Sequence, residues 1–208
     1  MLFCQLGQAH SLREICGGLA TSLGKIIHLG LRKAPSRSTL AYANEHRPWQ
    51  LYEKLFYHIL GLCKHQFPGK HKFRFKNKLL SFDATVIKLC LSIYDWAKFR
   101  RTKGAIKVHL LLDHAGYLPQ FVNITTGKVH EVNILKNLSF EPGTIVVFDR
   151  GLVDYQHWGN WTKEGIYFVT RLKKNADYQV IKSNKVPKNK NILKDQLIEL
   201  EGFYSKQK

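Results

Sequence analysis

The 208-residue sequence predicts a mixed α/β sheet preceded by a small helical region. Apolar residues recur at intervals of three and four along residues 1–62, which is the helical period. After residue 72 the period changes to short runs that suit β-strands, and the later runs alternate with helical segments. This order predicts three early antiparallel strands, followed by parallel strands added through helical crossovers.

Helices are expected first, at residues 11–20, 21–31 and 36–64. Ser11 and Ser36 are placed as N-caps, and Pro35 stands where a helix can begin. Short helices with these spacings resemble a helix-turn-helix arm, but any small helical bundle gives the same pattern. Residues 1–65 are therefore expected to form a helical N-terminal region, with DNA reading left open.

The second region, residues 72–180, is expected to carry the sheet. Its strand segments are residues 79–94, 105–114, 118–125, 144–149 and 166–172. Helices are expected at residues 131–140 and 152–165, between the later strands. Residues 181–208 read as a basic C-terminal segment.

The charge of the chain points to a polyanionic partner. Its 33 Lys and Arg against 15 Asp and Glu give a net charge of +18 and a pI near 9.8. Eleven basic residues and two acidic ones lie between residues 64 and 103, with aromatic residues interleaved. A solvated surface would explain a shorter charge run, but this density with interleaved aromatic residues favours a nucleic-acid surface.

Other function classes have no support in the sequence. The four cysteines form no CxxC pair, and the ten histidines show no metal-binding spacing. No apolar run has the roughly 18 residues that a membrane span needs, and the N-terminus lacks the features of a signal peptide. We therefore expect no membrane partner and a cytoplasmic, nucleoid-associated location.

Two aspartates interrupt or end strand segments: Asp83 lies within "SFDATVI", and Asp149 ends "TIVVFD". Adjacent strands of one sheet would bring the two carboxylates together. An unpaired buried carboxylate costs several kcal/mol, so we expect a cation there, and Mg²⁺ prefers such oxygen ligands. The alternative is that Asp83 caps a turn and Asp149 opens the next helix.

Four ordered motifs resemble a known protein family. "SFDAT", "WAKFRRTKGAIKVHLLLDHAGYLPQFVNITTGKVHEVN", "VVFDRGLVDY" and "YFVTRLKKNADY" are similar to bacterial insertion-sequence transposases of the IS-four type. The resemblance implies an RNase H-like catalytic domain with an Asp-Asp-Glu triad. Such a triad binds two Mg²⁺ or Mn²⁺ ions and cleaves transposon ends to give a 3′ hydroxyl that attacks target DNA. Because two ends must be held together, a homodimer is a candidate assembly.

Carried over by motif, the resemblance makes Asp83 and Asp149 the first two catalytic and metal-binding residues. It also implies double-stranded DNA, as transposon ends and target, as the partner, and places further basic side chains along that DNA: Arg100, Lys103, Lys107, Arg150, Arg171, Lys173 and Lys174.

The third acidic ligand is not identified by the resemblance. The family's Tyr-Arg-Glu-Lys type signature is absent after residue 180, and Glu199 and Glu201 lack its flanking residues. Glu164 lies in a turn before a strand and is interpreted as structural. The chain is therefore expected to be a truncated transposase with negligible cleavage activity of its own.

Two other functions remain open at this point. The chain could be a non-catalytic DNA-binding protein that occupies transposon ends or inhibits full-length transposase. It could also be a general RNase H-like nuclease without end specificity.

Overall fold

The structure, a computed structural model, describes residues 5–22, 24–66, 73–89, 98–100, 103–186 and 191–201, with side chains at all of these except 98–100 and 103. Its contacts divide the chain into two units, Met1–Ile59 and Leu60–Lys208. The last residues of the strand segment expected at 79–94 lie outside the described residues. Within the described ranges, no helix combines the length and the apolar character needed to cross a membrane.

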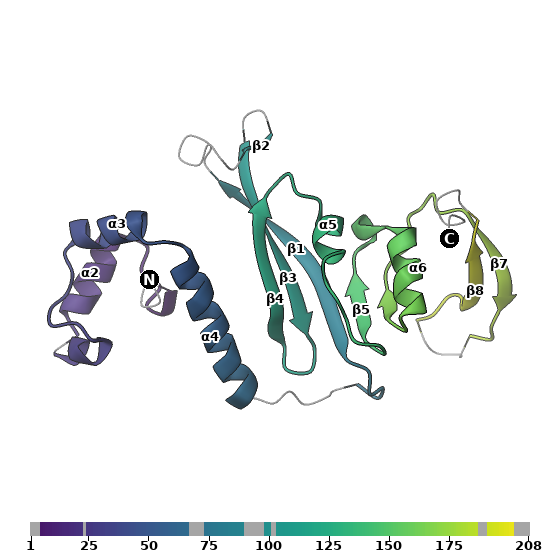
Figure 1. Ribbon diagram of the computed structural model, residues 1–208, viewed down its shortest axis with the longest axis horizontal. Coiled ribbons are helices and arrows are strands. Elements are labelled where there is room, and N and C mark those ends of the chain that lie inside the picture. Colours follow the sequence, from purple (N-terminus) through teal and green to yellow (C-terminus); the bar gives the residue numbers. More distant parts are fainter. Residues whose placement is uncertain are drawn as a thin grey trace. The chain divides into compact units, whose positions relative to one another are not determined.

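The first unit is helical, as predicted (Figure 1). Its elements are α2 (Leu12–Ala20), η1 (Lys25–Leu29), α3 (Arg37–His46) and the start of α4 (Gln50–Gln66). The helix expected at 21–31 is thus only a short 3-10 helix, and the segment expected at 36–64 is divided in two, because Arg47 before Pro48 has an extended backbone. Both predicted N-caps are confirmed: the hydroxyl of Ser11 accepts from the amide of Glu14, and that of Ser36 from the amide of Thr39. The short η1 begins and ends next to glycines in the left-handed region, Gly24 at φ 80° and Gly30 at φ 72°.

The core of this unit is small. Ile15 and Leu19 of α2 and Ile26 of η1 are buried together, and Leu40 of α3 packs against them. α2, η1 and α3 share this core, and DNA reading by the unit stays a prediction.

The second unit contains a six-stranded mixed sheet (Figure 1). Its strands are β1 (Leu79–Leu89), β2 (Lys98–Arg100), β3 (Lys103–Asp113), β4 (Leu118–Thr126), β5 (Ile145–Phe148) and β6 (Tyr167–Val169). The order is β2-β3-β1-β5-β6, with β4 also paired to β3. β3 runs antiparallel to β1 and β4, whereas β5 runs parallel to β1 and β6. The predicted mixed sheet, consistent with an RNase H-like domain, is confirmed.

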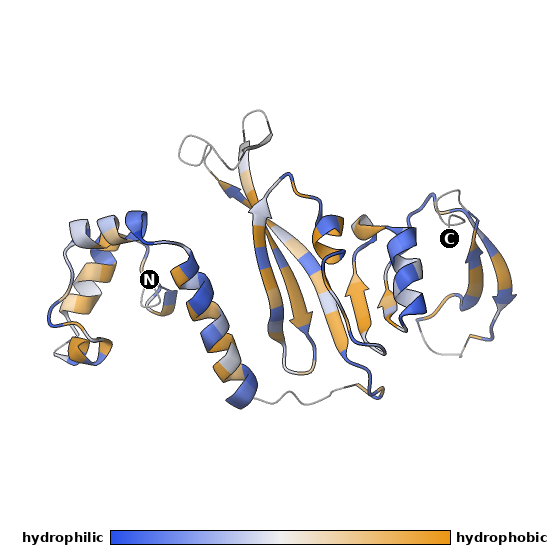
Figure 2. Ribbon diagram, viewed as in Figure 1, coloured by the Kyte–Doolittle hydropathy of each residue, from blue (hydrophilic) through white to orange (hydrophobic). Residues whose placement is uncertain are grey.

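Helices cover one face of this sheet. α5 (Glu131–Leu135) contributes Leu135, and α6 (Tyr155–Lys163) contributes Trp158 and Trp161, to one buried cluster with Phe82 and Phe148. Figure 2 shows β5 as hydrophobic throughout, whereas α6 is coloured from hydrophilic to intermediate. The buried side chains of α6 are its two tryptophans. Successive strand residues point to opposite faces, so the residues next to Phe82 and Phe148 point away from the helices.

The helix expected at residues 131–140 is shorter than predicted, because α5 ends at Leu135. Turns follow it, with the amide of Leu138 donating to the carbonyl of Leu135. Phe140 then packs edge-on against Trp161 of α6, with 5.4 Å between ring centroids. The apolar residues after Leu135 are therefore used in packing against α6 rather than in a longer helix.

The basic segment expected after residue 180 contains part of a β-hairpin. β7 (Tyr178–Ser183) and β8 (Gln196–Leu200) pair antiparallel as a separate two-stranded sheet. Val180 lies opposite Ile198, a cross-strand pair of β-branched residues. These β-branched residues indicated a strand, but the lysines around them led to the interpretation of a basic segment.

Candidate metal and DNA site

The register of the sheet brings the two predicted catalytic aspartates together. Phe82 of β1 is the parallel partner of Phe148 of β5. Asp83 and Asp149 each follow one residue later, so they are neighbours at the carboxyl end of β5. Both lie on the face opposite the helices, because the phenylalanines before them are in the helix-covered core.

The surroundings of Asp83 leave its carboxylate accessible. The side chain is exposed, and its Oδ1 accepts a hydrogen bond from the amide of Ala84 at 2.8 Å. β1 continues beyond Asp83 to Leu89, whereas β5 has already ended at Phe148. The expectation of a buried carboxylate is wrong here: the shorter neighbouring strand leaves Asp83 at the surface.

Asp149 is also exposed, with 56% of its side chain accessible. It is the N-cap of η3 (Arg150–Leu152), and its Oδ1 accepts from the amide of Arg150 at 2.8 Å. The same oxygen accepts from Nη2 of Arg171 at 2.9 Å. These hydrogen bonds, that from Arg171 first, lower the pKa of Asp149, so the carboxylate is ionised at neutral pH.

Arg171 extends the same row of residues. Val147 of β5 is the parallel partner of Val169 of β6, so the register continued by two residues places Asp149 beside Arg171. Asp83, Asp149 and Arg171 thus lie in one row across three adjacent parallel strands, level with the carboxyl end of β5. The sequence identified Arg171 as a DNA contact but not as the partner of Asp149. That pairing depends on the register of β5 and β6, which neither strand sequence shows by itself.

The two carboxylates fit a divalent cation. They are ionisable oxygen donors at one sheet edge, and each uses one oxygen in a hydrogen bond to the next backbone amide. Among residues whose placement is described, no group of three or more His, Cys, Asp or Glu could hold a metal ion. The described residues therefore provide two carboxylates, those of Asp83 and Asp149, as candidate metal ligands.

The three glutamates considered as the third acidic ligand lie elsewhere in the second unit. Glu199 is on β8 opposite Gln179, and the amide of Glu201 donates to the carbonyl of Asp177. Glu164 is the C-cap of α6, where it ends the helix before β6.

Basic side chains surround the end of the row. Arg150 follows Asp149 and is exposed, and Lys173 and Lys174 are exposed in the segment after Arg171. These positions suit contacts with a phosphate backbone near the carboxylates, and their DNA contacts stay a prediction. Arg100 of β2 and Lys103 of β3 form a backbone pair, and their side chains lie outside the described residues.

Lys107 is separated from this group. It is the antiparallel partner of Val86, three residues after Asp83 on β1, and therefore points to the opposite, helix-covered face. Only 14% of its side chain is accessible. Its Nζ lies 3.2 Å from Oε1 of Glu131 and donates to the carbonyl of Val129 at 3.1 Å. The sequence did not indicate this internal ion pair, and its DNA contact stays a prediction.

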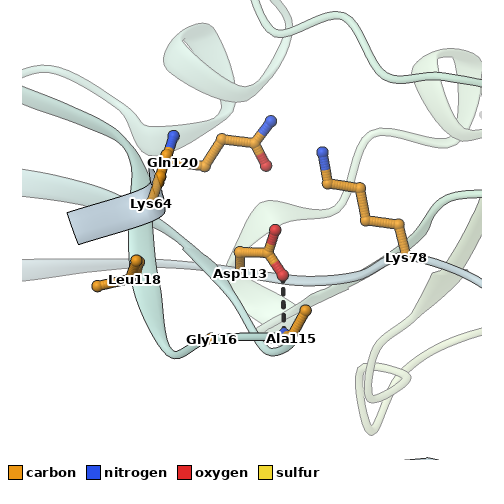
Figure 3. A pocket seen from close by; sticks show the side chains of 7 residues that line it. All are labelled: Lys64, Lys78, Asp113, Ala115, Gly116, Leu118 and Gln120. Atoms are coloured by element: carbon orange, nitrogen blue, oxygen red, sulfur yellow. Dashed lines mark hydrogen bonds between the residues drawn. The ribbon is translucent and has the colours of Figure 1, made fainter. Parts of the chain in front are cut away.

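A cavity of about 240 Å³ lies elsewhere in this unit, at the turn between β3 and β4 (Figure 3). It is lined by Lys64, Lys78, Asp113, Ala115, Gly116, Leu118 and Gln120. Asp113 accepts from the amide of Ala115 at 2.8 Å and so stabilises the turn. No predicted site residue lines this cavity, and the carboxylate pair is instead on an open surface.

Comparison with known proteins agrees with the resemblance carried by the four sequence motifs. The family model described as "Transposase DDE domain" matches residues 74–207, and a domain of unknown function matches residues 1–32. The chain is 29% identical over 159 residues to "Putative transposase y4zB" of Sinorhizobium fredii, covering 74% of this chain and 42% of that protein. It is 23% identical over 146 residues to "Probable transposase for insertion sequence element IS5377" of Geobacillus stearothermophilus, covering 70% and 38%. The chain thus spans about two fifths of these relatives.

Proposed function

Because the chain belongs to the DDE transposase family, we propose that it binds transposon-end DNA and that Asp83 and Asp149 are its metal-binding carboxylates. The observation that carries this proposal is the parallel pairing of Phe82 with Phe148, which puts the two aspartates side by side. The assignment to the IS-four type rests on the four sequence motifs and is part of the proposal.

The chemistry assigned to the site is phosphodiester cleavage. Divalent ions bound there would activate the attacking oxygen and stabilise the leaving oxygen at phosphorus. Asp83 and Asp149 supply negative oxygen ligands, and the lowered pKa of Asp149 keeps that ligand ionised. Arg150, Lys173 and Lys174 would hold the DNA backbone against them through phosphate contacts. Mg²⁺ and Mn²⁺ both accept such ligands.

We further propose that the 208-residue chain alone binds DNA but cleaves it negligibly. The supporting observation is that its described residues hold two carboxylates at the site without a cluster of three. Groups that act as one catalytic unit lose most of their activity when one is missing. The net charge of +18 supports a DNA-binding role for this chain, with or without a second copy.

The test incubates the purified chain with duplex DNA carrying transposon ends, in the presence of Mn²⁺. We expect salt-dependent binding without 3′-end nicking. Robust nicking that disappears in Asp149→Ala would contradict the inactive assignment and establish a complete site. Equal cleavage of end-containing and random duplexes would instead indicate a general nuclease.

Metal binding is tested separately from cleavage. Mn²⁺ titration followed by electron paramagnetic resonance should show binding that is lost in Asp83→Asn. Glu201→Gln, which removes an acidic side chain outside the pair, is the matched control. DNA affinity without any Mn²⁺ binding would contradict the metal site and indicate a non-catalytic DNA-binding protein.

A further inference from the structure

The ion pair between Arg171 and Asp149 lies at the surface, where either side chain can change its partner. Nη2 of Arg171 lies 2.9 Å from Oδ1 of Asp149, so the guanidinium neutralises a carboxylate assigned above to metal binding. The side chain of Arg171 is 78% accessible, and that of Asp149 is 56% accessible. Both side chains can therefore exchange this contact for another without disturbing buried packing.

A metal ion and this guanidinium would use the same negative charge. A divalent ion bound to Asp149 repels a cation placed within hydrogen-bonding distance of the same oxygen. Oδ1 also accepts from the amide of Arg150, so with the contact from Arg171 that oxygen accepts two hydrogen bonds. Coordination of a metal ion through Oδ1 would displace Arg171, and a metal ion on Oδ2 of the same carboxylate would weaken the contact by charge repulsion.

The position of Arg171 in the chain permits this movement. β6 ends at Val169, so Arg171 lies just beyond the sheet and is followed by the exposed Lys173 and Lys174. When the guanidinium of Arg171 is released from Asp149, it is exposed to solvent, as these two lysines are. Its planar donors suit a phosphate group of the DNA backbone.

We propose that Arg171 alternates between Asp149 in the metal-free chain and a DNA phosphate in the metal-bound chain. This inference rests on the proposed metal site. Arg171 is a positioning residue in this scheme: it orients the Asp149 carboxylate before metal arrives, and it couples metal binding to DNA binding. By thermodynamic reciprocity, metal strengthens DNA binding by the same factor by which DNA strengthens metal binding.

The experiment measures Mn²⁺ affinity by electron paramagnetic resonance, without DNA, for the wild-type chain and three variants. Arg171→Gln removes the competing cation, and we expect its Mn²⁺ affinity to rise on the order of threefold, as for loss of one exposed ion pair. Lys173→Gln removes the same charge two residues away and should change the affinity much less. Arg171→Lys keeps the charge and should remain close to wild type.

A second measurement follows DNA affinity with and without Ca²⁺, which supports binding without cleavage. In the wild-type chain Ca²⁺ should strengthen binding of a duplex, and Arg171→Gln should reduce that gain, whereas Lys173→Gln should weaken binding equally in both conditions. Mn²⁺ binding that is lost in Asp83→Asn but unchanged in Arg171→Gln would overturn the alternation and leave the proposed metal site standing. Absence of Mn²⁺ binding by the wild-type chain would overturn both.

Discussion

Phe82 and Phe148 are parallel partners on β1 and β5, and each is buried one residue before an exposed aspartate. Phe82 is 2% accessible and Phe148 is 5% accessible. The ring of Phe148 packs against Trp158 and Trp161, with centroids 5.6 and 6.0 Å away. The hydrophobic core therefore fixes the backbone positions from which Asp83 and Asp149 extend.

Truncation of Phe148 should consequently damage both stability and the metal site. Phe148→Ala opens a cavity between β5 and α6, and we expect a loss of about 3–5 kcal/mol in the free energy of unfolding. Chemical denaturation of the purified chain measures this loss. Val169→Ala on β6 is the control, because Val169 is 55% accessible and its truncation should cost far less. Equal losses in the two variants would contradict the assigned core.

The mixed character of the sheet and the proximity of the two aspartates could be predicted from the sequence, because apolar periodicity and turn residues determine which segments form strands. Asp83 and Asp149 were identifiable because each breaks an apolar run. Their exposure could not be predicted in the same way. It depends on β5 ending at Phe148 while β1 continues to Leu89, and relative strand lengths are not visible in either segment alone.

Other contacts could not be predicted because they join residues far apart in sequence through side-chain geometry. Lys107 reads as one more cation in a basic stretch, and only the sheet register shows that it points toward the helix-covered face. The pairing of Arg171 with Asp149 likewise depends on the register of β5 and β6. Charge composition indicates a partner, whereas strand register decides which charges face it.

The ion pair between Lys107 and Glu131 should contribute to stability more than to DNA binding. The pair is partly buried, with 14% and 30% of the two side chains accessible, so Glu131→Gln should cost about 1–2 kcal/mol, between the values for surface and buried pairs. A double-mutant cycle with Lys107→Met measures the coupling by chemical denaturation. Additive losses would show that the two charges do not interact.

The exposed lysines after β6 should contribute to DNA binding more than to stability. Lys173→Gln should leave the free energy of unfolding within about 0.5 kcal/mol of wild type, because its side chain is exposed. It should weaken DNA binding and reduce the slope of log affinity against log salt concentration by about 1, as expected for one lost phosphate contact. Lys107→Met is the comparison, and a larger change of salt slope in that variant would assign the DNA surface to the other face of the sheet.

His109 should make the stability of the second unit depend on pH. It is fully buried on β3, its Nε2 lies 2.8 Å from Oγ1 of Thr125, and burial lowers its pKa below 6.5. The charged groups facing it have opposing effects, since Glu131 raises this pKa and Lys107 lowers it. The folded chain thus binds fewer protons at this site than the unfolded chain does, at pH values between the lowered pKa and 6.5.

Stability should therefore fall as the pH is lowered through about 6.5, and the effect of His109 should level off below its folded pKa. Denaturation midpoints at a series of pH values measure this dependence. His109→Gln removes the titrating group and should flatten the dependence, although His157, whose pKa burial also lowers, retains part of it. His130→Gln, at an exposed position, is the control. An unchanged pH dependence in His109→Gln would show that protonation of this histidine is not linked to folding.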